Sequence, residues 1–364
     1  MFGHRPGPSR EQVLEALRDV QDPELHRSIV ELDMVRDVTI RDGQVRVDAL
    51  LTISGCPLRE TIVESIRQRV AQLPGVRAVD VNLGVMSAEQ RQALITKLRG
   101  PQPTDRPPAF LGPDSPVRVL AVASGKGGVG KSTVTANLAV ALAQRGARVG
   151  LIDADVYGFS IPRMLGLEGR PTVIDQMIIP MERWGVRAIS MGMLVDREDA
   201  VVWRGPMLHK ALVTFIGEVH WGDVETLLID LPPGTGDVSI TIAQQLPRAE
   251  MLVVTTPQPA AVEVAARAAR MAQKVNMRVV GVIENMSYYD PPGAGRVYPF
   301  GTGGGRALAQ RLGVPLLAEV PLDPRVRECA DRGEPVVLAE PDSPAVAAFL
   351  RAAEALRAAA VAAP

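Results

Sequence analysis

The sequence predicts an α/β protein whose mostly parallel, doubly wound sheet is preceded by a small α+β domain. From Val117 onward, short apolar runs alternate with segments of helical apolar spacing, which is typical of a parallel sheet covered on both faces. Residues 9 to about 90 form a separate block of helical and strand patterns. The proline-rich stretch 100–108 lies between the two blocks. We therefore expect a small domain over 1–95, a linker over 96–116 and the α/β domain over 117–364.

Composition narrows the class of protein. The net charge of −1, from 40 basic and 41 acidic residues, favours neither nucleic acid nor an anionic membrane as a partner. The N-terminus has no apolar signal core, and no apolar run reaches membrane-spanning length. The two cysteines, Cys56 and Cys329, are far apart in sequence and form no disulfide framework. We therefore expect a cytoplasmic protein.

The first block begins with Ser9, a suitable cap for a helix over 11–20. Alternating strands are expected over 35–40 and 44–52, because Asp42-Gly43 between them is a hairpin signal. A helix over 58–73 and a strand over 75–83 complete the block. At the start of the second helix, backbone N–H groups would stabilise a thiolate of Cys56. The alternative is a buried Cys56 that fills a tight turn.

The motif G-x-x-x-x-G-K-[ST] spans Gly125 to Ser132. It follows an apolar strand, expected over 117–122, and precedes a helix over 135–144, which is the context of a phosphate-binding P-loop. Its backbone N–H groups and the helix N-terminus would bind phosphates, the Lys131 ammonium would reach the β- and γ-phosphates, and the Ser132 hydroxyl would bind Mg²⁺. The predicted nucleotide-binding residues here are Gly125, Lys126, Gly127, Gly128, Val129, Gly130, Lys131, Ser132 and Thr133.

Lys126 is a second lysine in this loop, although only five of the 40 basic residues are lysines. One interpretation is that its side chain points away from its own nucleotide, crosses a two-fold axis and completes the site of a second subunit. The other is a solvated lysine that only raises the local potential.

Two further strand ends carry carboxylates. Asp153 and Asp155 follow the strand expected over 148–152, and we assign Asp155 to the attacking water and Asp153 to Mg²⁺ or a lysine. The alternative for both is helix capping. Asp230 ends an apolar strand over 226–230 and is predicted to engage Mg²⁺, and the N–H of Gly234 is placed to bond the γ-phosphate. The loop 231–237 is therefore a candidate switch.

Later strand ends supply a pocket for the base. Asn285 ends the strand expected over 278–283 and carries both a donor and an acceptor for an adenine edge, although a turn role is the alternative. Pro321 and Asp323 follow the strand over 315–320 and would close the other side. Strands are also expected over 250–255, and an Ala-rich helix over 344–361. Cys329 lies in a helical pattern that predicts burial.

With these motifs in hand, the chain closely resembles the Mrp-type iron–sulfur cluster carrier ATPases of the MinD/ParA group. The resemblance rests on both lysines of the P-loop, the Asp153/Asp155 pair, the 230–237 segment and Glu284-Asn285-Met286-Ser287. It extends to the first block through Asp22-Pro23-Glu24 and Gly55-Cys56-Pro57. It implies a slow, Mg-dependent ATPase that works as a homodimer and delivers [4Fe–4S] clusters to apo-proteins or receives them from assembly factors.

One feature departs from the family. After the Asn-Met-Ser segment such carriers place a C-x-x-C pair, whereas residues 290–295 contain no cysteine. Thiolates are the preferred ligands of iron–sulfur centres. Cys56 then becomes the candidate ligand, alone or with thiols of a partner. The competing hypothesis is a nucleotide-switched positioning or regulatory ATPase that carries no cluster.

Overall fold

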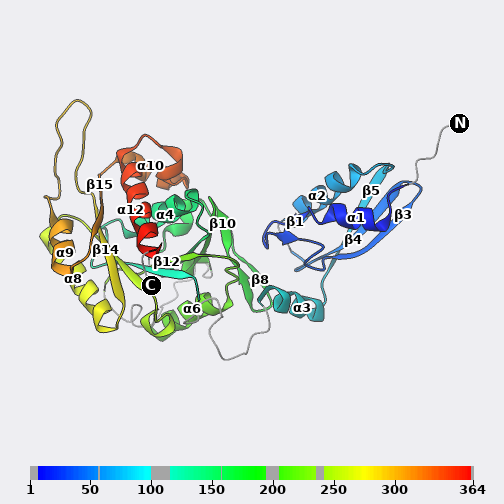
Figure 1. Ribbon diagram of the computed structural model, residues 1–364, viewed down its shortest axis with the longest axis horizontal. Helices are drawn as coiled ribbons and strands as arrows, with labels where there is room; N and C mark the ends of the chain where they lie inside the picture. Colours follow the sequence, from blue (N-terminus) through cyan, green and yellow to red (C-terminus); the bar gives the residue numbers. More distant parts are fainter. Residues whose placement is uncertain are drawn as a thin grey trace. The chain divides into compact units, whose positions relative to one another are not determined.

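The computed structural model describes residues 7–55, 58–99, 115–156, 158–193, 205–234 and 242–361 (Figure 1). The chain forms two compact units. Within the described residues, the smaller unit comprises 7–99 and the segment Thr172–Ile179, and the larger unit comprises the rest.

The larger unit is built on an eight-stranded sheet with the order β10-β11-β7-β12-β6-β13-β14-β15 among the described residues. Neighbouring strands are parallel except for the edge pair β10 and β11, which is antiparallel. The strands are β6 (Arg118–Ser124), β7 (Val149–Asp153), β10 (Met181–Arg183), β11 (Val186–Ser190), β12 (Thr226–Asp230), β13 (Glu250–Thr255), β14 (Arg278–Asn285) and β15 (Leu316–Val320). The predicted α/β class with a mostly parallel sheet is confirmed.

Helices cover both faces of this sheet, with α4 and α12 on one face and α8 and α9 on the other (Figure 1). Helix α4 is buried on nearly all sides, as its apolar sequence predicts for a helix between a sheet and another helix. The helices are α4 (Lys131–Gln144), α5 (Ile161–Leu165), α6 (Gly205–Glu218), α8 (Pro259–Lys274), α9 (Gly304–Leu312), α10 (Pro324–Arg332), α11 (Val336–Ala339) and α12 (Pro344–Val361), with a 3₁₀ turn over Met191–Met193.

The smaller unit has a three-stranded sheet in which β3 pairs antiparallel with β4 and β4 pairs parallel with β5. Ser9 caps its first helix with a complete capping box, as predicted. Its elements are α1 (Arg10–Leu17), β1 (Gln21–Asp22), β2 (Arg27–Ser28), β3 (Val35–Arg41), β4 (Gln44–Leu51), α2 (Arg59–Ala71), β5 (Ala78–Val85) and α3 (Ala88–Arg99).

The smaller unit also contains the antiparallel hairpin of β8 (Thr172–Ile174) and β9 (Met177–Ile179). In sequence this hairpin lies between α5 and β10 of the larger unit. Its residues Ile174, Met177 and Ile179 are buried in the core of the smaller unit, together with residues of α1, β4 and α2. The sequence reasoning, which separated the domains at the proline-rich stretch, did not anticipate this insertion.

Candidate functional site

The P-loop joins β6 to α4 in the predicted context. Gly128 and Gly130 have φ angles of 82° and 79°, a region that favours glycine. Gly125 is required for a different reason: a Cβ atom there would lie 2.3 Å from the backbone N of Ala265 in α8. The glycines of the motif thus allow both the turns of the loop and the close approach of a helix from the opposite face.

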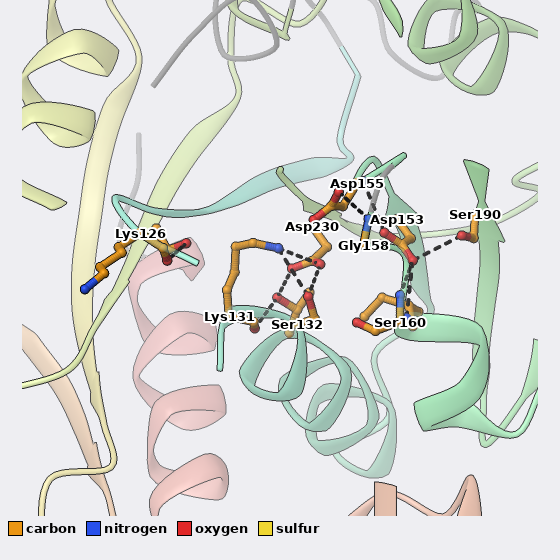
Figure 2. A network of polar contacts seen from close by, with 12 residues as sticks. Lys126, Lys131, Ser132, Asp153, Asp155, Gly158, Ser160, Ser190 and Asp230 are labelled. Carbon is orange, nitrogen blue, oxygen red and sulfur yellow. Dashed lines mark hydrogen bonds and ion pairs between the residues drawn. The ribbon is translucent and has the colours of Figure 1, made fainter. Parts of the chain in front are cut away.

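Lys131, Ser132 and Asp230 form one connected cluster (Figure 2). The Nζ atom of Lys131 lies 2.7 Å from Oδ2 of Asp230, and the Ser132 hydroxyl donates to the same oxygen at 2.6 Å. The ends of β6 and α4 thereby meet the end of β12. The structure brings together the three residues that the sequence assigned to phosphate and Mg²⁺.

Thr135 belongs to the same cluster and was missed by the sequence reasoning. Its hydroxyl lies 2.7 Å from Oδ1 of Asp230 and 2.9 Å from the carbonyl oxygen of Lys131, and the side chain is fully buried. The signal was its position one helical turn after Lys131, on the same side of α4. With Thr135, both oxygens of the Asp230 carboxylate are bonded.

Asp153 is fully buried at the end of β7, opposite Asp230 in the strand register. Its Oδ2 accepts from the backbone N–H groups of Ser160 and Ile161 at 3.2 Å and from the Ser190 hydroxyl at 3.1 Å. Burial, followed by the neighbouring charge of Asp230, raises the pKa of Asp153 to about 7, whereas these hydrogen bonds act in the opposite direction. Ser160 and Ser190 were not identified from the sequence.

Asp155 and Lys126 lie on different sides of this cluster (Figure 2). The Asp155 carboxylate accepts from the Gly158 backbone N–H at 2.9 Å. It lies on the side of the cluster where Asp153 and Asp230 are found. Lys126 is exposed, and its side chain points away from Lys131 and Asp230. Both interpretations of Lys126, a solvated lysine and a residue that serves a second subunit, agree with this direction.

Two predicted ligand-binding groups make protein contacts here. The Asn285 amide donates to the carbonyl oxygen of Val129 at 2.9 Å, and a Cβ on Gly130 would lie 2.3 Å from the same nitrogen. Asn285 thus packs directly on the P-loop. The Gly234 N–H donates to the carbonyl oxygen of Ser124 at 3.2 Å, which ties the start of the predicted switch to the end of β6.

Asp323 caps α10, and Pro321 is buried just before it. The Asp323 carboxylate accepts from the Arg325 guanidinium at 2.8 Å and from the Ser343 hydroxyl at 2.7 Å. Burial alone would raise the pKa of Asp323, but the hydrogen bonds from Arg325 and Ser343 outweigh it and hold that pKa below its ordinary value. These two bonds reach Oδ2, and the Arg325 backbone N–H donates to Oδ1 at 3.0 Å, so both carboxylate oxygens have protein partners.

Of the two cysteines, the structure describes only Cys329. Cys56 and residues 235–237 of the predicted switch lie outside the described residues. Cys329 is buried in α10 as expected, and burial raises the pKa of its thiol. In the segment where the family resemblance implies a C-x-x-C pair, Arg296 donates to both carboxylate oxygens of Asp290 at 2.8 Å and lies 3.6 Å from the Tyr288 ring centre.

The donor set suits Mg²⁺. Across the described residues, no group of three or more His, Cys, Asp or Glu side chains is gathered as a ready-made metal site. The oxygens of Ser132, Asp153 and Asp230 are hard ligands, and Mg²⁺ in nucleotide sites is commonly held by one or two carboxylates together with substrate phosphates. A nucleotide would supply the remaining ligands.

A sequence model of the family described as NUBPL iron-transfer P-loop NTPase matches residues 116–357. The chain belongs to this family. A second model, that of an iron–sulfur cluster assembly protein, matches residues 10–83 of this NUBPL-type NTPase. The resemblance drawn from the sequence motifs is confirmed.

Two of the curated proteins similar to this chain are named iron–sulfur cluster carrier protein. An iron–sulfur cluster carrier protein of Mycobacterium tuberculosis is 51% identical, over 94% of this chain and 92% of that protein. Its counterpart in Bacillus subtilis is 44% identical, over 86% and 88%. A solved nucleotide-binding protein of Archaeoglobus fulgidus, in complex with ADP, is 38% identical with a TM-score of 0.54, over 64% of this chain and 91% of that one. These names do not favour the alternative of a positioning or regulatory ATPase.

None of the helices in the described part of the chain is both long and apolar enough to span a membrane.

Proposed function

We propose that the protein is an ATP-hydrolysing carrier of iron–sulfur clusters, which works with Mg²⁺ as a cytoplasmic homodimer and delivers clusters to apo-proteins. The observation that carries the nucleotide part is the buried Lys131–Asp230–Ser132 cluster beside a glycine-rich loop. The family and the names of the relatives support the carrier part.

The residues of the chain have separate tasks in this proposal. The P-loop amides and the Lys131 ammonium bind the phosphates, so Lys131 exchanges its partner Asp230 for the nucleotide. Ser132, Asp230 and Asp153 provide oxygens for Mg²⁺, which neutralises phosphate charge when it is bound. Asp155 orients the attacking water, and Lys126 reaches the γ-phosphate held by the second subunit. The nucleotide base lies near Asn285, Pro321 and Asp323.

In this proposal the iron–sulfur cluster is the transported cargo, and the unusual feature is the small number of cysteines available to bind it. A [4Fe–4S] cluster commonly takes four cysteines, and this chain has two, of which Cys329 is buried. Cys56 from two subunits supplies two thiolates. The client or the assembly factor supplies the others, so that the cluster is held between proteins during transfer.

Calorimetry with Mg·ATP tests the nucleotide part. The wild type is expected to bind, and Lys131→Ala to bind about 10- to 100-fold more weakly, because a charge-assisted hydrogen bond is worth about 1.5–3 kcal/mol. Lys210→Ala serves as a control, since Lys210 is an exposed lysine of α6 outside the P-loop. Absence of binding by the wild type would refute the nucleotide part.

Anaerobic reconstitution with iron and sulfide tests the carrier part. The wild type is expected to acquire iron and sulfide, alone or from a loaded donor, and Cys56→Ser to acquire less than half as much. If the wild type acquires no cluster by either route, the proposal of carriage is wrong, whereas nucleotide binding is judged separately by the calorimetric test.

A further inference from the structure

The β8–β9 hairpin is part of the core of the smaller unit. Ile174, Met177 and Ile179 are at most 3% exposed and pack with residues of that unit. Burial of three such apolar side chains stabilises the packing of the hairpin in that unit. The hairpin is therefore firmly attached to the smaller unit.

Two polar contacts fix the hairpin further. The Thr172 hydroxyl donates to the Glu24 carboxylate at 2.5 Å. The Arg91 guanidinium of α3 donates to the Asp175 carboxylate at 2.9 Å, at the turn of the hairpin, where Asp175 has a φ of 54°. Both partners are within the smaller unit, so the strands and the turn of the hairpin are each held.

The chain segments before and after the hairpin both donate hydrogen bonds to Asp153. Before the hairpin, the Ser160 and Ile161 N–H groups donate to Oδ2 of Asp153. After the hairpin, the Ser190 hydroxyl donates to that same oxygen and accepts from the Gly192 N–H at 3.1 Å. The residues that orient this carboxylate are thus joined to each other through the hairpin.

The connection that follows the hairpin is short. Pro180 alone separates β9 from β10, and Met181 of β10 pairs with Ala188 of β11, two residues before Ser190. On the other side, residues 166–171 join the end of α5 to β8. The Trp184 indole N–H donates to the Leu165 carbonyl oxygen at 3.0 Å, which ties the chain after the hairpin to the chain before it. The hairpin is therefore joined to the Ser190 end of β11 by one residue and the β10–β11 pair.

We propose that the β8–β9 hairpin couples the smaller unit to the nucleotide site, because the segments on either side of it orient Asp153. Nucleotide binding fixes Asp153 and its donors and stabilises the hairpin within the smaller unit. By linkage, a change in the hairpin's attachment to the smaller unit changes nucleotide affinity by the same factor. This inference rests on the proposed nucleotide-binding function.

Hydrogen exchange on the full chain tests the coupling. With saturating Mg·AMP-PNP, amides of 172–179 are expected to exchange at least about fivefold more slowly, the low end for coupled sites. Protection of the P-loop amides in the same spectra reports binding. P-loop protection with unchanged exchange over 172–179 overturns the coupling alone. Absence of P-loop protection refutes nucleotide binding and the coupling together.

Two conservative variants test the reverse direction. Arg91→Gln and Asp175→Asn remove the ion pair at the hairpin turn, and Asn tolerates the positive φ at position 175. Each is expected to weaken Mg·ADP binding about fivefold. Lys97→Gln is the matched control, because it removes an ion pair with Asp33 from the same helix without involving the hairpin. Its affinity is expected to equal that of the wild type.

A double-mutant cycle separates coupling from a general loss of stability. Because the two residues act through one ion pair, the double variant is expected to weaken binding about fivefold, no more than either single variant. Wild-type affinity in both single variants, with faster exchange over 172–179, would overturn the proposal. So would an equal loss of affinity in Lys97→Gln.

Discussion

The Nζ atom of Lys131 and the Oδ2 atom of Asp230 lie 2.7 Å apart, with side chains that are 6% and 0% exposed. The P-loop lysine is thus neutralised by a strand carboxylate. Removing one partner of a buried pair leaves the other charge without compensation, which is more costly than the pair is stabilising. Because of this asymmetry, a substitution of one partner alone tests whether the pair is buried and charged.

Asp230→Asn is expected to lower the free energy of unfolding by about 3–5 kcal/mol, because it leaves the buried Lys131 ammonium without its counter-charge. Urea denaturation of the nucleotide-free protein measures the loss. Asp223→Asn is the control: Asp223 also pairs with arginines but is 61% exposed, so a loss below about 1 kcal/mol is expected. Equal losses in the two variants would contradict the buried-pair interpretation.

Thr135→Val is expected to destabilise the larger unit by about 1–3 kcal/mol, since it leaves Oδ1 of Asp230 without its donor in a buried site. Thr135→Ser keeps the hydroxyl and is expected to lose less. Denaturant midpoints of the two variants give the comparison. A valine variant as stable as the serine variant would show that the hydroxyl is not needed there.

Lys126→Ala is expected to bind Mg·ATP with the wild-type affinity and to lose hydrolysis by at least about 100-fold, in the range found when a group that stabilises the transition state is removed. The reason is the direction of the side chain, which points away from its own Lys131–Asp230 cluster. Calorimetry and phosphate release measure the two effects. Turnover equal to that of the wild type would reject the role in the second subunit and leave a solvated lysine.

Asp153 gives a pH-dependent prediction. Its pKa is raised from 3.8 to about 7, so between these values the folded chain binds a proton that the unfolded chain lacks, and the folded state loses stability as the pH rises. Asp153→Asn removes this titration. The stability of the variant relative to the wild type is therefore expected to rise by about 1–4 kcal/mol from about pH 5 to pH 8.

Denaturation in the absence of nucleotide and Mg²⁺ checks this trend. Asp223→Asn is again the control, because its arginine partners hold the pKa of Asp223 below its ordinary value despite the opposing effect of burial. No trend is expected for it over the same pH range. A stability difference for Asp153→Asn that does not change with pH would contradict the raised pKa.

Most strands of the larger unit were predictable because each is marked by a pattern within a short stretch of sequence. The six strands expected in the α/β domain all form, and three of their carboxyl ends bring Lys131, Asp153 and Asp230 together. Strand periodicity and the rule that parallel strands end at one edge are sufficient for this result. The roles of these residues with a nucleotide stay predictions.

The parts that the sequence did not reveal depend on contacts far apart in the chain. Ser190 is bonded to Asp153 only because β11 pairs with β7, and a lone serine at a strand end has no distinctive pattern. Strands β8 and β9 have three residues each, too few for a periodicity signal. Helix α9 begins at Gly304 inside a glycine run, and a Cβ on Gly304 would lie 2.3 Å from the Pro257 carbonyl oxygen, a contact that the sequence does not reveal.

The assignment of the β8–β9 hairpin to the smaller unit has a consequence for how this protein can be divided into fragments. A fragment that ends at the proline-rich linker lacks part of its own interior, and a fragment that starts there carries Ile174, Met177 and Ile179 with nothing to cover them. The two units therefore cannot be separated by a single cut at the linker. A shortened chain that lacks the smaller unit therefore also needs changes in the eight residues Thr172–Ile179.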